Sequence, residues 1–236
     1  MKTIGVLGGI GPQATMDFEH RVHQAAQQLV PADGMRGYPP LVVFYCRFAP
    51  FVADESGAPV LPRRPDPRLL DAAAKLGALA DFVVVTSNAT HLFQREIEEA
   101  AGCEVLSMID VAILEVERRD WRRVGVLGFG DPVVYTQPLE RMGLTVETVT
   151  DVLQTPLDQA IHRVMEGRAA QDEARAARAA IAELRARSVD GTLLGCTEIA
   201  PLLGAGANAP DLLDPLPLLA SAAVRHALDD QLRQTA

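Results

Sequence analysis

The chain has 236 residues, a net charge of −9 and a pI near 5.0. This charge disfavours a nucleic-acid partner, because such proteins gain affinity from Lys and Arg side chains that neutralise phosphates. Apolar residues make up 48% of the chain, enough for one large domain or two small ones. No apolar run reaches the roughly 18–20 residues of a membrane span, and the N-terminus has no secretory pattern. We therefore expect a cytoplasmic protein without membrane contact.

The three cysteines, Cys46, Cys103 and Cys196, stand far apart, and none forms a CxxC pair. They are too few for a disulfide scaffold, so we expect reduced thiols. The His, Cys and Asp residues do not have zinc-ligand spacing, and no Lys has a Schiff-base context. The sequence thus predicts neither a metal site nor a cofactor.

Short apolar, β-branched runs alternate with alanine-rich stretches, the pattern of an α/β fold in which helices cover parallel sheets. The predicted strands are residues 4–7, 40–45, 82–85, 124–127, 145–149 and 192–194. The predicted helices are residues 12–29, 91–101, 156–165, 170–187 and 217–232.

The sequence contains an internal repeat. Residues 4–12 read IGVLGGIGP, and residues 124–132 read VGVLGFGDP. Residues 84–88, VVTSN, correspond to residues 193–197, LLGCT, in the second copy of the repeat. We therefore predict two similar Rossmann-like domains, each a parallel sheet in a three-layer arrangement, related by a pseudo-twofold axis. The first comprises residues 1–112 plus 215–236, and the second residues 113–214.

Ser87 and Cys196 are the candidate catalytic residues, because each follows a repeated strand and open α/β sheets bind ligands beyond the carboxyl ends of their strands. If the halves face each other, the two side chains approach one ligand from opposite sides. Inverting a carbon next to a carboxylate needs a base on one face and an acid on the other, and a thiol serves well after a modest pKa shift. We expect the following helix N-terminus to lower the pKa of Cys196. Thr197 and Asn88 are placed to stabilise the enolate-like charge.

Each candidate also has a purely structural interpretation. Cys196 is alternatively a buried core thiol, as we expect for Cys46 and Cys103. Ser87, a weaker base than a thiol, is alternatively a helix cap. His91 lies four residues after Ser87 and either activates its hydroxyl or, as we favour, orients the loop.

The loop from Gly8 to Ala14 also fits G-x-G-x-x-A, a weak dinucleotide-binding signal. That fingerprint expects an acidic residue at the end of the second strand. This chain has Cys46 and Arg47 there, which disfavours a nicotinamide site.

Four motifs give the chain a family resemblance: GVLGGIGPQAT at residues 5–15, Asn88 with His91, LGCTEI at 194–199 followed by PLL at 201–203, and LDP at 213–215. Over its whole length the chain resembles the aspartate/glutamate racemase superfamily, specifically its aspartate racemase branch. The resemblance implies two similar α/β domains, no pyridoxal phosphate, one cysteine base from each domain and often a homodimer. It makes Cys196 the second-domain thiol, acting on the L-face proton. The expected substrate contacts are Gly9, Ile10, Arg47, Asn88, Ala89, Thr197 and Glu198.

The chain departs from the family pattern at three places. Where the family reads PCNTAH, residues 86–91 read TSNATH, so Ser87 replaces the first-domain cysteine. The arginine of a Pro-Asp-Arg segment has no clear counterpart in residues 49–62, and Met165 stands where a lysine is expected. Those two cations bind the dicarboxylic substrate in the family, so the sequence does not predict aspartate or glutamate as the substrate.

These residues favour a cofactor-independent racemase or epimerase of an amino acid or related carboxylic acid. Cys196 abstracts the Cα proton, and Ser87 lies on the opposite face. The alternatives are a single-cysteine decarboxylase or isomerase of the same superfamily and a non-catalytic ligand-binding relic. The expected partner is a small-molecule carboxylate.

Overall fold

The computed structural model describes residues 1–30, 37–55, 59–168 and 171–234. The chain divides into two compact units, one formed by Met1–Met108 with Leu216–Ala236 and the other by Ile109–Pro215. Each unit contains a four-stranded parallel sheet with flanking helices. This architecture confirms the predicted α/β class.

The two sheets have the same strand order. The first, in the order β2-β1-β3-β4, comprises β1 (Ile4–Gly8), β2 (Leu41–Tyr45), β3 (Phe82–Val85) and β4 (Val105–Leu106). The second, in the order β6-β5-β7-β8, comprises β5 (Arg123–Leu127), β6 (Thr145–Glu147), β7 (Gly191–Leu194) and β8 (Leu212–Leu213). The six predicted strands are present, and within the described residues the strands that the sequence missed are the two-residue strands β4 and β8.

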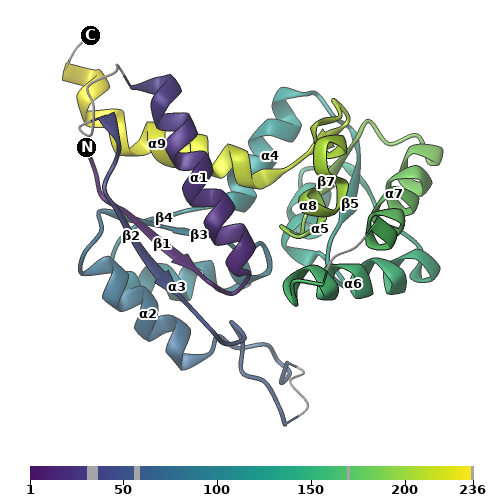
Figure 1. Ribbon diagram of the computed structural model, residues 1–236, viewed down its shortest axis with the longest axis horizontal. Helices are drawn as coiled ribbons and strands as arrows, with labels where there is room; N and C mark the ends of the chain where they lie inside the picture. The colour runs from purple at the N-terminus through teal and green to yellow at the C-terminus, as the bar shows by residue number, and fades with distance from the viewer. Residues whose placement is uncertain (31–36, 56–58, 169–170, 235–236) are drawn as a thin grey trace. The chain divides into compact units, whose positions relative to one another are not determined.

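Helices cover both faces of the first sheet (Figure 1). On one face lie α1 (Pro12–Leu29) and α9 (Pro215–Gln234), and on the other lie α2 (Pro67–Gly77) and α3 (Gln94–Ala101). Leu69, Leu76 and Ile97 from α2 and α3 pack with Val83 and Val85 of β3 in one buried cluster. The helix predicted over residues 91–101 is divided, since a 3-10 helix, Ala89–Phe93, precedes α3.

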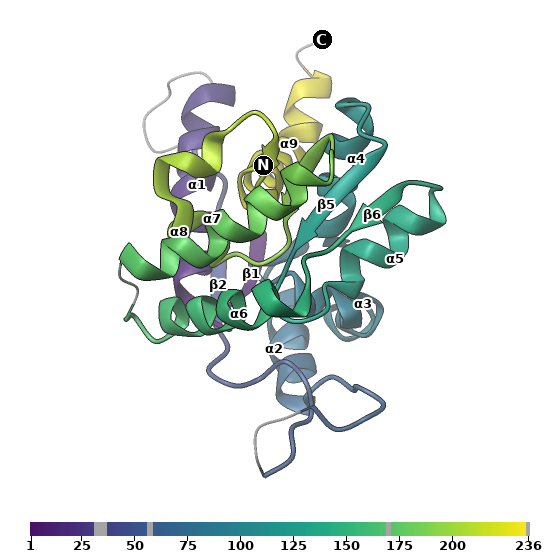
Figure 2. The same cartoon turned by 90° about the vertical axis from the view of Figure 1, so that its right-hand side faces the viewer.

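The second unit contains α4 (Met108–Arg118), which begins at the last residue of the first unit, α5 (Val133–Arg141), α6 (Asp151–Met165), α7 (Gln171–Ala186) and α8 (Ile199–Leu203). Helices α6 and α7 lie side by side (Figure 2) and bury Leu157, Ile161 and Leu184 against Leu127 and Leu194 of the sheet. Helix α6 begins at Asp151, five residues before the start predicted at Pro156. Among the helices within the described ranges, none is long and apolar enough to cross a bilayer.

Helix α2 illustrates how local sequence signals define an element. Pro67 occupies its first turn, where a missing N–H costs nothing. Asp66 precedes it, and its carboxylate accepts the Arg68 amide hydrogen bond at 2.8 Å. The same carboxylate pairs with the Arg68 guanidinium at 2.7 Å, and this partner lowers the pKa of Asp66. Helix α2 therefore begins at a charged N-cap.

We expect Gly77→Ala to destabilise the first unit, because α2 and α3 approach closely at this residue. A Cβ atom on Gly77 would lie 1.8 Å from the Ala101 carbonyl oxygen. Separating the helices to relieve this clash costs about 3 kcal/mol. Urea unfolding followed by circular dichroism measures the effect as a lower midpoint. Gly206→Ala is the control, since nothing lies within 4 Å of its Cβ position; equal midpoints for the two variants would contradict the packing.

Candidate active site

Three of the predicted site loops lie at one edge of the first sheet. Strand β1 pairs with both β2 and β3, with Gly8 opposite Tyr45 and Leu7 opposite Val85. Parallel strands present their carboxyl ends at the same edge. The loop of Gly9 and Ile10, the residue Arg47 and the turn of Ser87 and Asn88 therefore emerge together. The Cys46 amide extends the pairing by donating to the Gly8 carbonyl at 2.7 Å.

Gly9 has φ +78°, and a Cβ atom there would lie 2.6 Å from Tyr45 Cα. Both the left-handed backbone and the close approach of β2 require glycine. Arg47, at the end of β2, is exposed, and its guanidinium lies 4.9 Å from the centre of the Tyr45 ring. The Tyr45 hydroxyl in turn donates to Glu19 at 2.9 Å. The first edge thus carries one cation above a close-packed glycine turn.

A buried hydroxyl network connects the loop after β1 to the end of β3. Thr15 Oγ1 accepts the Gly9 amide hydrogen bond at 2.8 Å and lies 2.9 Å from Thr86 Oγ1. Both threonines are buried, and Thr15 also donates to the Gly11 carbonyl at 3.3 Å. Sequence reasoning did not assign Thr15 a role, although a polar residue on the buried face of α1 was a detectable signal. The network holds the Gly9 loop at a fixed distance from the Ser87 turn.

The half-buried Ser87 hydroxyl accepts a hydrogen bond from Thr90 Oγ1 at 2.8 Å. His91 lies on the other side of this turn, against backbone groups. Its Nδ1 lies 2.9 Å from the Ser87 carbonyl oxygen, and its Nε2 accepts the Met108 amide at 3.1 Å. These contacts fit a histidine that orients the loop, as favoured from the sequence. Asn88, not Ser87, occupies the N-cap position of the 3-10 helix, which disfavours the capping interpretation of Ser87.

The remaining first-unit candidates differ in exposure. Asn88 is buried, Ala89 is exposed and Ile10 is half-buried. Cys46 is buried within the hydrophobic cluster, and burial raises its pKa to about 11, with a smaller contribution from the Asp66 carboxylate. This thiol is therefore protonated at neutral pH, consistent with a structural role.

Cys196 follows β7 at the carboxyl edge of the second sheet. Strands β5 and β7 pair with Leu127 opposite Leu194, and the Gly195 amide donates to the Leu127 carbonyl at 2.6 Å. A Cβ atom on Gly195 would lie 2.9 Å from that carbonyl oxygen and 3.1 Å from the Tyr135 ring. Tyr135, which the sequence did not single out, is fully buried and supports the turn that carries Cys196.

A carboxylate binds the Cys196 thiol. Cys196 Sγ donates to Glu198 Oε2 at 3.1 Å, and Thr197 Oγ1 donates to the same oxygen at 3.0 Å. Glu198 is only 5% exposed. Burial and the Glu198 carboxylate together raise the pKa of Cys196 well above its ordinary value, with a smaller contribution from Asp158.

The expectation that a helix N-terminus lowers the pKa of Cys196 is therefore wrong. Helix α8 begins only at Ile199 and is five residues long. The nearest charge is negative, and it accepts the thiol hydrogen, so it favours the protonated form. Thr197, expected to face the substrate, directs its hydroxyl hydrogen to Glu198 instead.

Helix α6 holds the loop after β5 beside the Cys196 turn. Asp158 Oδ1 accepts the Gly130 amide at 2.9 Å, and Gln154 Nε2 donates to the Gly128 carbonyl at 3.0 Å and to Asp158 at 2.7 Å. The half-exposed Phe129 ring packs edge-on against His162, with the ring centres 4.8 Å apart. The sequence missed these supports, because nothing local relates α6 to a loop more than twenty residues earlier.

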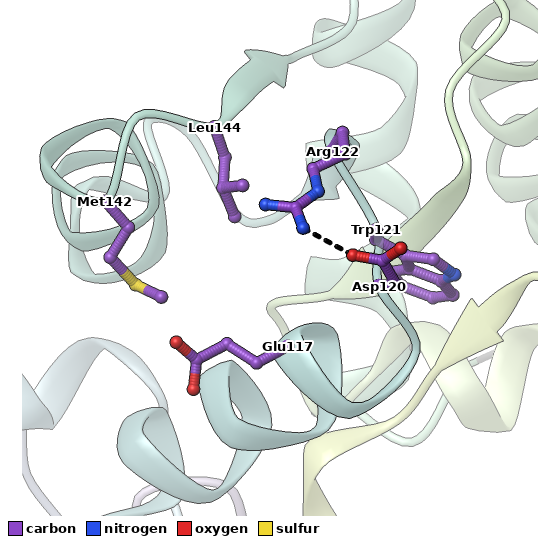
Figure 3. Close-up of a pocket in the computed structure, with 6 residues that line it drawn as sticks. All are labelled: Glu117, Asp120, Trp121, Arg122, Met142 and Leu144. Carbon is purple, nitrogen blue, oxygen red and sulfur yellow. Dashed lines mark hydrogen bonds and ion pairs between the residues drawn. The ribbon is translucent and has the colours of Figure 1, made fainter.

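A pocket of about 400 Å³ lies in the second unit, between the end of α4 and the segment that follows α5 (Figure 3). Its lining residues are Glu117, Asp120, Trp121, Arg122, Met142 and Leu144. Arg122 precedes β5 and Leu144 precedes β6, so the pocket lies at the amino ends of these strands. It is therefore separate from the Cys196 edge. Within the described residues, no group of three His, Cys, Asp or Glu side chains is placed to hold a metal ion.

Comparison with known proteins relates this architecture to a family of enzymes. The broad specificity amino-acid racemase RacX of Bacillus subtilis is 30% identical over 114 residues, which are 48% of this chain and 48% of that protein. The chain thus matches about half the length of this curated relative.

Two solved structures share the fold. A Picrophilus torridus aspartate racemase superposes with a TM-score of 0.78 at 21% identity, covering 96% of this chain and 94% of its own. An aspartate racemase homologue from Pyrococcus horikoshii gives 0.75 at 22% identity, covering 96% and 99%. A family model described as Asp/Glu/hydantoin racemase matches residues 7–224. The chain belongs to the Asp/Glu/hydantoin racemase family.

Proposed function

We propose that this protein is a cofactor-independent racemase or epimerase that acts at the α-carbon of an amino acid or related carboxylic acid. The observation that carries the proposal is the Cys196 thiol, at the end of a strand, donating its hydrogen to the buried Glu198 carboxylate at 3.1 Å. Family membership and the amino-acid racemase named among its relatives support the same reaction.

Glu198 supplies the base that a protonated thiol needs. When substrate binds, the Cys196 proton passes along the Sγ–H···Oε2 hydrogen bond to Glu198, and the resulting thiolate takes the α-proton. The electron pair left on the α-carbon delocalises into the substrate carboxylate and forms an enediolate. The Cys196 pKa is raised by burial and by Glu198, so the thiolate exists only transiently and is a correspondingly strong base.

Ser87 is the proposed acid on the opposite face of the same carbon. Its oxygen accepts the Thr90 hydroxyl hydrogen bond, so its own hydrogen is available for another acceptor. Protonation of the enediolate from that side inverts the centre and leaves Ser87 as an alkoxide, which regains a proton from solvent while Glu198 releases the proton that it received. A serine alkoxide is far harder to form than a thiolate. Inversion is therefore slower than proton exchange at Cys196.

The substrate carboxylate has two kinds of proposed partner in the first unit. Arg47 offers an exposed guanidinium, and the loop after β1 offers the Ile10 backbone amide, since the Gly9 amide is bonded to Thr15. Asn88 and Ala89 complete the proposed contacts, whereas Thr197 gives its hydroxyl hydrogen to Glu198. In the loop after β5, the exposed residues Phe129 and Asp131 carry no positive charge, which supports an amino acid with an uncharged side chain over a dicarboxylic one.

We further propose that the enzyme works in the cytoplasm as a homodimer and without pyridoxal phosphate. The net charge of −9 and the three free cysteines support a reducing compartment and a small-molecule partner. Sedimentation velocity tests the dimer.

The α-hydrogen of one enantiomer should exchange with solvent deuterium, and Cys196→Ala should reduce this exchange by roughly 10²-fold or more because it removes the base. Proton NMR of a panel of L- and D-amino acids, aspartate included, follows the α-proton signal. Cys103→Ala is the control, since this half-buried thiol lies before β4, away from the carboxyl edge. Exchange that survives in Cys196→Ala contradicts the assignment. Carbon dioxide release from a malonate-type acid would indicate a decarboxylase instead. Ligand binding without exchange or turnover would indicate a non-catalytic ligand-binding relic.

Ser87→Cys should raise the rate of inversion by roughly 10-fold or more, because a thiol gives and takes a proton more readily than a hydroxyl at neutral pH. The equilibrium constant of racemisation is one, so kcat/KM should rise equally in both directions. Polarimetry measures inversion, and α-proton exchange from the D-enantiomer should rise with it. Ser221→Cys, on α9, is the matched control. An unchanged inversion rate in Ser87→Cys would count against Ser87 at the reacting carbon.

Glu198→Gln should lower the pKa of Cys196, because the negative charge and the hydrogen-bond acceptor that favour the thiol are both weakened. Peptide mass spectrometry follows the rate of iodoacetamide alkylation at Cys196 as a function of pH. The midpoint of this pH profile should move to a lower pH. Asp158→Asn should produce a smaller shift in the same direction. Glu117→Gln, in the pocket at the other edge, should leave the midpoint unchanged. If the midpoint of the Cys196 alkylation profile is unchanged or higher in Glu198→Gln, the Glu198 carboxylate does not raise the pKa of Cys196.

A further inference from the structure

His91 joins two backbone groups that belong to different strand ends. Its Nδ1 lies 2.9 Å from the Ser87 carbonyl oxygen, just after β3, and its Nε2 lies 3.1 Å from the Met108 amide nitrogen, just after β4. The side chain is 8% exposed. Both nitrogens of this buried ring are therefore within hydrogen-bond distance of main-chain partners.

The partners determine where the ring proton lies. The Met108 amide can only donate, so Nε2 must present its lone pair. The Ser87 carbonyl can only accept, so Nδ1 must carry the hydrogen. An imidazolium, with hydrogen on both nitrogens, would direct one of them at the amide hydrogen. The geometry thus selects a single uncharged tautomer with the proton on Nδ1.

The His91 ring bridges β3 and β4 beyond the last residue pair of the two strands. Strands β3 and β4 pair at Val83 with Val105 and at Val84 with Leu106, and neither strand extends more than one residue further. Ser87 and Met108 lie beyond this pairing. The imidazole spans the separation and bonds one carbonyl and one amide that the ladder no longer pairs.

The two joined positions matter for different reasons. Ser87 is the proposed acid, whereas Met108 is the first residue of α4 and the last residue of the first unit. We propose that His91 is a positioning residue that holds the Ser87 turn in register with the start of α4. The catalytic consequence rests on the proposed function of Ser87, but the connection itself does not.

The test compares His91→Phe with His91→Gln in the full chain. Phenylalanine fills the space without polar atoms. Glutamine retains one donor and one acceptor and should rescue part of the function. In His91→Phe, inversion should fall roughly 10-fold in kcat with KM within about twofold, and amide exchange at Met108 should speed up by roughly 10-fold or more. His23→Phe is the matched control, because His23 Nδ1 makes the same contact, at 2.7 Å, to the carbonyl four residues earlier on an exposed helix.

Two readouts do not depend on activity. Long-range nitrogen–proton NMR should show the His91 proton on Nδ1 and a bare Nε2, and hydrogen exchange reports the Met108 amide. A proton on Nε2, or a Met108 amide equally protected in wild type and His91→Phe, would overturn the proposal. Absence of isotope exchange in the wild type would instead remove the proposed function of Ser87, and the tautomer and amide protection would still decide whether His91 holds the turn.

Discussion

Parallel hydrogen bonding between β1 and β3, and between β5 and β7, determines where the candidate catalytic side chains of this chain lie. Each pairing brings a glycine-containing loop beside a strand end that carries a hydroxyl or a thiol, Ser87 in one sheet and Cys196 in the other. A slip of one residue would turn every side chain of the strand to the opposite face. Close approaches that favour glycine lie at both edges, Gly9 against Tyr45 of β2 and Gly195 against the Leu127 carbonyl of β5.

Buried polar groups beneath each edge then give the two sheets different chemistry. In the first unit, Thr15 and Thr86 are neutral hydroxyls that connect backbone to backbone. In the second, the Glu198 carboxylate receives hydrogen from both Cys196 and Thr197. Buried polar atoms must be paired, so each network restricts its loop to one arrangement. The strand order is shared, but the buried network is neutral in the first unit and carries negative charge next to the thiol in the second.

The sequence predicted the strands and the repeat well, because strands buried in a parallel sheet appear as continuous apolar runs. Strands β4 and β8 have two residues each and are too short to leave such a pattern. The orienting role of His91 was predictable, since Ser87 lies one helical turn before it. The roles of Tyr135 and Asp158 were not predictable, because they depend on contacts with segments distant in sequence. For Thr15, its place on the buried face of α1 was the one available signal.

The direction of the Cys196 pKa shift shows a different limit of sequence reasoning. A residue followed by a helix suggests favourable backbone dipoles, and that local argument gave the wrong sign. Burial of the thiol raises its pKa most, and the turn of the chain directs the Glu198 carboxylate back to it. Together these effects outweigh the dipole of a five-residue helix. Side-chain direction within a turn cannot be inferred from spacing alone.

The C-terminal segment belongs to the first unit, so synthesis of the first unit is completed after that of the second. Helix α9 packs on the first sheet, with the Lys2 amide bonded to the Ala227 carbonyl at 2.9 Å and the Phe82 and His226 rings 4.5 Å apart. The ribosome synthesises α9 only after all of the second unit. Until then the face of the first sheet that α1 covers lacks its second helix, whereas residues 109–215 have already been synthesised. The inserted unit can therefore fold before the unit that surrounds it in the chain.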